Sequence, residues 1–256
     1  MERRQFVWGT VGVIGGAAAM GLFSQRDRSA GETPEGPAPE PRVRVGRTSY
    51  AAMGEDLILG SLLKDVLKIA SPTYLDIGAA DPIAASNTYL LYTEGSRGVL
   101  VEPNPTYVER LKAVRPGDTV LGVGIGAGEA READYYVIKG QPMLNSFSPE
   151  TVEFRRKNGY EVERVVKMPL VPVMTVIDEH FKAAPDLLSI DAEGFDLDIA
   201  KSMDLTRYRP AVVCAETKGP KATHESTPLA QYLMGHGYLV TAGTIYNTIL
   251  VDRARL

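Results

Sequence analysis

Short apolar runs alternate with helix-like segments through the body of the chain. Consecutive apolar residues bounded by Gly, Pro or charged residues are typical of buried strands. Such runs predict strands at residues 73–77, 98–101, 119–124, 186–191 and 210–216. Apolar residues at helical spacing predict helices over residues 55–70, 87–93, 105–114, 176–181, 197–203 and 228–236. Strands that alternate with helices predict an α/β fold, with an open, mostly parallel sheet and helices on both faces.

The alternation is interrupted once and ends in a different pattern. Residues 134–139 and 164–173 read as strands on either side of a polar insertion at residues 141–160. Residues 238–242 and 247–251, separated by a short turn, predict a C-terminal antiparallel hairpin. No repeat or second globular domain is visible in the pattern.

The first 46 residues differ from this body. Two arginines, Arg3 and Arg4, precede an uncharged apolar stretch at residues 6–23, which is the outline of a targeting sequence. The order of these residues resembles a twin-arginine export signal, and about 18 apolar residues also just suffice for an uncleaved membrane anchor. We therefore expect an export signal or anchor at 1–28, with membrane association through residues 6–23, and a Pro-rich linker at 29–46. The folded domain is then 47–256, membrane-anchored or exported, or cytoplasmic if Met1 is not the true start.

Charge and cysteine content exclude some functions. The formal net charge is -4, and the seven basic and five acidic residues of the first 50 leave 21 basic and 27 acidic residues elsewhere. A body with a net charge of -6 argues against a nucleic-acid partner, whose phosphates require a basic surface. Cys214 is the single cysteine and lies in an apolar run, so it is expected to be a buried strand residue.

The loop after the first predicted strand carries the clearest chemical signal. It reads Asp76-Ile77-Gly78-Ala79-Ala80, and Gly78 allows the backbone to approach a ligand. Glu102, at the end of the second strand, lies 26 positions after Asp76, close to the offset of a ribose-binding carboxylate in nucleotide-binding α/β units. The loop lacks G-x-G-x-x-G, so it predicts a nucleoside ligand without a diphosphate. S-adenosylmethionine is the obvious candidate.

Acidic residues also end the later strands. Asp191 and Glu193 follow the strand at 186–191, and Glu216 ends the next one. Two close carboxylates can have different proton affinities, which makes Asp191 our first candidate for a general base. Glu193 and His224, the latter in a polar loop after residue 216, are the other candidates. Alternatively, these two acids could hold a divalent cation with Glu216, and we assign no metal ligand. They could also be acids at a helix N-terminus, where the helix dipole favours them, although this explains Asp196 and Asp198 better than Asp191.

Several blocks, in this order, resemble the FkbM family of methyltransferases. They are YAAMGEDLIL (50–59), YLDIGAADPIAASNTYLLY (74–92), GVLVEPNP (98–105), LLSIDAEGFDLD (187–198) and VVCAET (212–217). The resemblance spans residues 48–252 and implies a Rossmann-like class I methyltransferase fold. It also implies S-adenosylmethionine as cofactor and, commonly, O-methylation of a sugar, glycan or polyketide-like hydroxyl.

The resemblance also implies roles for single residues. The cofactor-binding residues would be Asp76, Gly78, Ala80, Glu102, Asn104 and Asp191. Asp191 and Glu193 would border the methyl-transfer site, and the segment 86–88 would contact cofactor or substrate. The glycine-rich segment 124–128 departs from the family pattern, so we assign no adenine contact there. The insertion at 141–160 would shape the acceptor site, although its aromatic residues Phe147, Phe154 and Tyr160 suit core packing equally well.

Two other functions fit parts of the sequence. A chain exported from the cytoplasm would meet no S-adenosylmethionine, which favours a membrane-tethered, non-catalytic module that binds a glycan or nucleoside. The retained acids at 76, 102 and 191 argue against that alternative. A nicotinamide-dependent oxidoreductase is weakened by the missing G-x-G-x-x-G motif.

Overall fold

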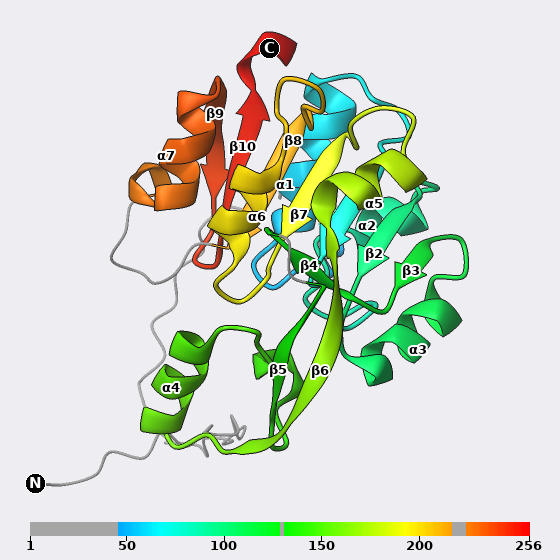
Figure 1. Ribbon diagram of the computed structural model, residues 1–256. Helices are drawn as coiled ribbons and strands as arrows, with labels where there is room; N and C mark the ends of the chain where they lie inside the picture. The colour runs from blue at the N-terminus through cyan, green and yellow to red at the C-terminus, as the bar shows by residue number, and fades with distance from the viewer. Residues whose placement is uncertain (1–45, 129–130, 217–223) are drawn as a thin grey trace, which may run out of the picture. The chain divides into compact units, whose positions relative to one another are not determined.

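The computed structural model describes residues 46–128, 131–216 and 224–256 (Figure 1). The predicted export signal or anchor at 1–28, and all but the last residue of the predicted linker, lie outside these residues. Within the described ranges, no helix is long and apolar enough to cross a membrane.

A seven-stranded sheet forms the centre of the domain, in the order β3-β2-β1-β7-β8-β10-β9. The five neighbouring strands β3, β2, β1, β7 and β8 are parallel, and β10 runs antiparallel to both β8 and β9. The bounds are β1 Tyr74–Ile77, β2 Gly98–Val101, β3 Thr119–Leu121, β7 Leu187–Ile190, β8 Val212–Glu216, β9 Tyr238–Gly243 and β10 Asn247–Asp252. The predicted α/β fold with a mostly parallel sheet and a C-terminal hairpin is confirmed.

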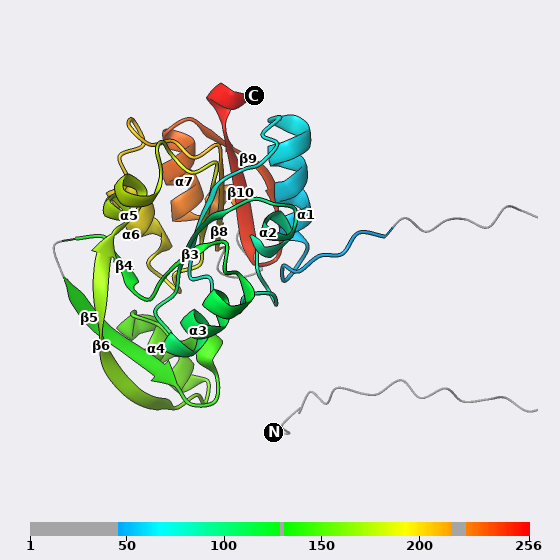
Figure 2. The same ribbon diagram turned by 90° about the vertical axis from the view of Figure 1, so that its right-hand side faces the viewer.

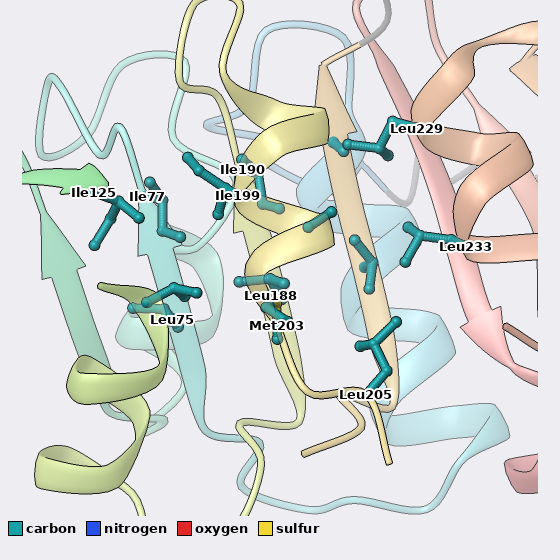
Figure 3. Packing of buried hydrophobic residues seen from close by; sticks show 14 of the residues in the cluster. Leu75, Ile77, Ile125, Leu188, Ile190, Ile199, Met203, Leu205, Leu229 and Leu233 are labelled. Atoms are coloured by element: carbon teal, nitrogen blue, oxygen red, sulfur yellow. The ribbon is translucent and has the colours of Figure 1, made fainter. Parts of the chain in front are cut away.

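Helices cover both faces of this sheet (Figures 1 and 2). One face packs on α5 (Val173–His180), α6 (Asp196–Ser202) and α7 (Pro228–Gly235). Figure 3 shows this core, in which Leu75, Ile77, Leu188 and Ile190 of the strands meet Ile199, Leu229 and Leu233 of the helices. The other face packs on α1 (Glu55–Gly60) with its π-helical continuation (Ser61–Val66), α2 (Tyr89–Thr93) and α3 (Pro105–Val114). The inner strands β1 and β7 are buried on both faces, as is typical of parallel sheets.

The strands that flank the predicted insertion form a separate small sheet. Strand β5 (Glu132–Ile138) pairs antiparallel with β6 (Val162–Pro172), and β6 pairs parallel with β4 (Gly124–Gly126). Between β5 and β6 lies α4 (Pro149–Lys157), whose N-terminus is capped by Ser148, because the Ser148 hydroxyl accepts from the Thr151 N–H at 3.1 Å. The two strands and the polar segment between them are as predicted.

The predicted strand at 119–124 is divided. Its first part is β3 of the large sheet, and its end begins β4 of the small sheet. Gly124 allows β4 to pack closely in the small sheet, because a Cβ atom there would lie 2.5 Å from the Phe147 ring and 2.8 Å from the Leu170 side chain. The predicted helix at 55–70 also ends early, at Val66.

The strand order places the site. Strand β1 pairs with β2 on one side and with β7 on the other. The chain adds β2 and β3 on one side of β1 and later adds β7 and β8 on its other side, so the order of strand addition reverses between β1 and β7. In open α/β sheets, ligands bind at this switch point, beyond the carboxyl ends of the strands. The residues that follow β1 and β7 here are Gly78 and Asp191.

A buried ionic network supports β1 from beneath. Arg115, fully buried, donates to the Asp118 carboxylate at 2.8 Å, to the Tyr74 hydroxyl at 3.1 Å and to the Thr88 hydroxyl at 3.0 Å. The Thr88 hydroxyl in turn donates to Asp76 at 2.6 Å. This network joins α2 and α3 to the middle of β1.

We expect Arg115→Met to lower the free energy of unfolding by about 3–5 kcal/mol, because it leaves the buried Asp118 carboxylate without its cation. Urea unfolding followed by circular dichroism measures this loss. Arg110→Met is the matched control, since Arg110 is half exposed in its pair with Asp81 and should cost less than about 1 kcal/mol. Equal losses in the two variants would contradict the role of the buried network.

Candidate active site

Two backbone loops touch at the switch point. Gly78 has a φ of 84°, and a Cβ atom on it would lie 1.9 Å from the carbonyl oxygen of Asp191. The Asp191 N–H donates to the Ile77 carbonyl at 2.9 Å, which continues the β1–β7 pairing past the strand ends. Only glycine meets both requirements at position 78, since other residues avoid this φ and would clash.

A cavity of about 140 Å³ opens above this contact. Five of the predicted site residues line it: Gly78, Ala80, Glu102, Asp191 and Glu193. Much of the remaining lining is apolar or aromatic, and among its described lining residues there is no lysine or arginine. The walls therefore suit an uncharged ring and hydroxyl groups, and they suit phosphate poorly.

Glu102 forms one wall and holds two loops together. One carboxylate oxygen accepts from the Ala80 N–H at 2.9 Å, and the other accepts from the Asn104 N–H at 2.7 Å. Glu102 is only 4% exposed, and this burial raises its pKa to about 7, although the two N–H donors favour the ionised form. Ala80 adopts a φ of 46°, which is costly for a residue with a Cβ atom, and the bond to Glu102 helps to hold it there.

Asp191 lies on the opposite wall, next to other acids. Asp191 lines the cavity and is accessible from it. Protein atoms nevertheless enclose its carboxylate on the remaining sides and partly bury it. This burial, with the nearby carboxylates of Glu216 and Glu193, raises the pKa of Asp191 well above its ordinary value. Within the described ranges, no group of three or more His, Cys, Asp or Glu side chains is arranged to hold a metal ion.

The loop after β7 is fixed by its neighbours. The Asp196 carboxylate at the start of α6 accepts from the Ala192 N–H at 3.1 Å and from the Gly194 N–H at 3.2 Å. Glu193, between them, has a φ of 52°, and its carboxylate pairs with Arg155 of α4 at 2.5 Å. The Glu193 carboxylate is thus paired with the positively charged guanidinium of Arg155.

Three other predicted residues are outside the lining of this cavity. Asp76 is buried beneath it and accepts from Thr88. Asn104 faces a neighbouring cavity, where it caps α3 by accepting from the Thr106 N–H at 3.1 Å. His224 lies against β9 and β10, with its Nδ1 3.0 Å from the Thr248 hydroxyl.

The segment 86–88 packs under the site. The Ser86 hydroxyl accepts from the N–H of Tyr89, the first residue of α2, at 3.1 Å. The Asn87 amide donates to the Ser189 hydroxyl at 3.3 Å and lies 3.8 Å from the Cys214 sulfur. Cys214 itself is fully buried, as predicted.

Sequence reasoning missed most of the aromatic wall. Tyr107, Tyr135 and Phe195 line the cavity together with Phe147, the one aromatic of the insertion that does so. Phe147 contacts Tyr135 with ring centroids 4.7 Å apart, whereas Phe154 and Tyr160 are exposed. No local signal in the sequence distinguishes these rings from core aromatics, because residues from four separate segments form the wall.

The sequence matches one protein family over most of the domain. Residues 76–240 match the methyltransferase FkbM domain. No curated protein is matched by this chain.

Among solved structures, the fold is similar to that of precorrin-6y C5,15-methyltransferase from Geobacter metallireducens GS-15, at 14% identity and a TM-score of 0.42 over 80% of this chain and 90% of that one. It is also similar to an O-methyltransferase from Bacillus cereus in complex with SAH, at 13% identity and a TM-score of 0.38 over 75% and 79% of the two chains. At these values, neither likeness bears on the function of this chain.

We expect Gly78→Ala to destabilise the protein by at least about 2 kcal/mol more than Gly95→Ala. Gly95 shares the left-handed backbone, with a φ of 97°, but a Cβ atom there meets nothing within 4 Å. The control therefore measures the conformational cost alone, about 1 kcal/mol, and the difference measures the clash with the Asp191 carbonyl. Urea unfolding of both variants gives the two values. Equal losses would show that the two loops do not need this close approach.

Proposed function

This chain belongs to the FkbM family of methyltransferases, and we propose that it methylates a hydroxyl oxygen of a sugar, glycan or polyketide-like small molecule with S-adenosylmethionine as donor. The observation that carries the proposal is one cavity at the switch point of the sheet, with the Glu102 carboxylate on one wall and the Asp191 carboxylate on the other. Family membership supports methyl transfer, and the chemistry of the two walls supports the donor.

The described residues fit this donor. When bound, S-adenosylmethionine supplies a methyl group activated by a sulfonium. Gly78 presents bare backbone to the cavity, and the Glu102 carboxylate has lone pairs to accept ribose hydroxyls. The aromatic and aliphatic wall, which includes Tyr107 and Ile125, suits an uncharged base. The acidic surroundings suit a cationic ligand and disfavour the diphosphate of a nicotinamide dinucleotide.

Asp191 is the group we assign to proton removal. Its carboxylate is open to the cavity, and its raised pKa makes it a stronger base than an ordinary aspartate. Glu193 is paired with Arg155, and His224 bonds Thr248 outside the cavity lining, so both are weaker candidates. Asp191 would take the proton of the acceptor hydroxyl while its oxygen gains the methyl group, and the donor sulfur would leave with the electron pair of the broken carbon–sulfur bond as a neutral thioether. Enclosure of the reacting groups and their alignment supply the rest of the rate enhancement.

Asp191→Asn should lower turnover by a factor of about 10²–10⁴, because the amide cannot accept the proton. The affinity for S-adenosylhomocysteine should stay within tenfold. Transfer of labelled methyl groups to a panel of glycans and polyketides measures turnover, and calorimetry measures affinity. Asp198→Asn, on the exposed side of α6, is the control and should behave as wild type. Near-normal turnover of Asp191→Asn would remove Asp191 from the reaction.

Cofactor binding should depend on pH through Glu102. Ribose hydroxyls donate to the ionised carboxylate, whose pKa is about 7. The dissociation constant for S-adenosylhomocysteine should therefore be flat above pH 7 and rise about tenfold per unit below it. Without ligand, the folded state holds this proton more tightly than the unfolded chain, so the Glu102 contribution to stability falls as pH rises from 4.5 to about 7.

Calorimetry from pH 5.5 to 8 tests this dependence. Glu102→Gln is the matched control, since it keeps the size of the side chain but cannot ionise. Its binding should be weaker than that of wild type at pH 8 and nearly independent of pH. Identical pH profiles for the two proteins would show that the Glu102 carboxylate does not bind the ribose hydroxyls. If wild type bound NAD but not S-adenosylhomocysteine, the proposed function would be overturned.

A further inference from the structure

A charged residue of the insertion is buried against the loop after β7. Arg155 of α4 is 6% exposed. One of its guanidinium nitrogens lies 2.5 Å from a Glu193 carboxylate oxygen, and the other donates to the Leu144 carbonyl. A buried arginine requires such partners, because transfer of an unpaired charge from water is strongly unfavourable.

Two neighbours of Arg155 bind the same residue. The Ser146 hydroxyl donates to the Glu193 carbonyl at 3.2 Å, and the Thr151 hydroxyl donates to it at 3.3 Å. Three side chains of the insertion therefore converge on Glu193, two on its backbone and one on its carboxylate. Such convergence holds one residue more firmly than any single contact would.

The residue they hold is strained and lies two positions after Asp191. Glu193 has a φ of 52°, a conformation that a residue with a side chain adopts only when its surroundings enforce it. On the far side, Asp196 binds the N–H groups of Ala192 and Gly194, the neighbours of Glu193. The turn is thus fixed by α6 on one side and by the insertion on the other.

We propose that Arg155 is a positioning residue for methyl transfer, which holds the Glu193 turn and pairs with its carboxylate so that Asp191, rather than Glu193, takes the acceptor proton. This inference rests on the proposed function, because it assumes that Asp191 takes the proton. It gives the insertion a part in the reaction, since α4 anchors the loop that carries the base. Arg155 acts through Glu193 and is outside the lining of the cavity.

The charges around Asp191 support this role. Burial and the carboxylates of Glu216, Glu193, Asp196 and Asp76 all raise the pKa of Asp191. Arg155 is the cation paired with one of these acids. Without it, the Glu193 carboxylate would lose this counter-charge and would repel the ionised form of Asp191 more strongly.

A double-mutant cycle tests the proposal. The variants are Arg155→Met, Arg155→Lys, Glu193→Gln and the double variant Arg155→Met with Glu193→Gln. Arg156→Met is the matched control, because Arg156 follows Arg155 on α4 but is exposed. Unfolding temperature, kcat and KM for the acceptor, and the dissociation constant of S-adenosylhomocysteine are measured for each variant.

Arg155→Met should lower kcat at least tenfold and leave the dissociation constant within about threefold, since the cofactor walls at Gly78 and Glu102 are untouched. Arg155→Lys should recover part of kcat by restoring the charge without the second contact. The double variant should exceed Arg155→Met in kcat at least fivefold, because the Glu193 charge that Arg155 neutralised is then gone as well. A kcat of Arg155→Met equal to that of Arg156→Met overturns the proposal, as does a double variant no better than Arg155→Met.

Hydrogen exchange gives a readout that needs no acceptor. The amides of residues 192–194 should exchange faster in Arg155→Met than in wild type or Arg156→Met, whereas those of β1 should be unchanged. Equal protection in all three proteins overturns the inference about Arg155. Failure of wild type to bind S-adenosylhomocysteine overturns the proposed function instead, and the exchange result for the turn still decides whether Arg155 holds it.

Discussion

The rest of the site depends on the contact between the backbone at Gly78 and the carbonyl of Asp191. Parallel pairing of β1 with β7 ends both strands at the same edge, and the missing side chain of Gly78 lets the two loops touch. This contact sets how far Asp191 lies from the β1 loop. Glu102 then ties Ala80 of that loop to the end of β2, so the two carboxylates belong to one rigid frame.

Much of this frame could be predicted because its signals are local. The strands around Asp76, Glu102, Asp191 and Glu216 are short apolar runs, each bounded by residues that end a strand. Their alternation with helices implies a parallel sheet, and a parallel sheet brings its carboxyl ends to one edge. The placement of Gly78, Glu102 and Asp191 around one cavity follows from that rule alone.

The parts that could not be predicted depend on partners far apart in the chain. Arg115 stands 41 positions from Tyr74, and Arg155 stands 38 from Glu193. Nothing in the sequence around either arginine distinguishes it from a solvated surface residue. The left-handed backbone of Ala80 and Glu193 was likewise invisible, because no local preference of these residue types favours it. Sequence reasoning therefore found the acids of the site and Gly78, but not the two arginines that hold their loops.

The site departs from the rules that stabilise the rest of the domain. It buries Glu102 and crowds Asp191 with other acids, and both arrangements disfavour the ionised forms that the proposed reaction requires. Strained residues, Ala80 and Glu193, lie in the same loops. Such costs persist where function requires them and where well-packed surroundings compensate. Here the two helical layers and the network around Arg115 supply that compensation. A hydroxyl-rich, cationic ligand would remove part of the cost, because its hydroxyl groups and its positive charge favour the ionised carboxylates.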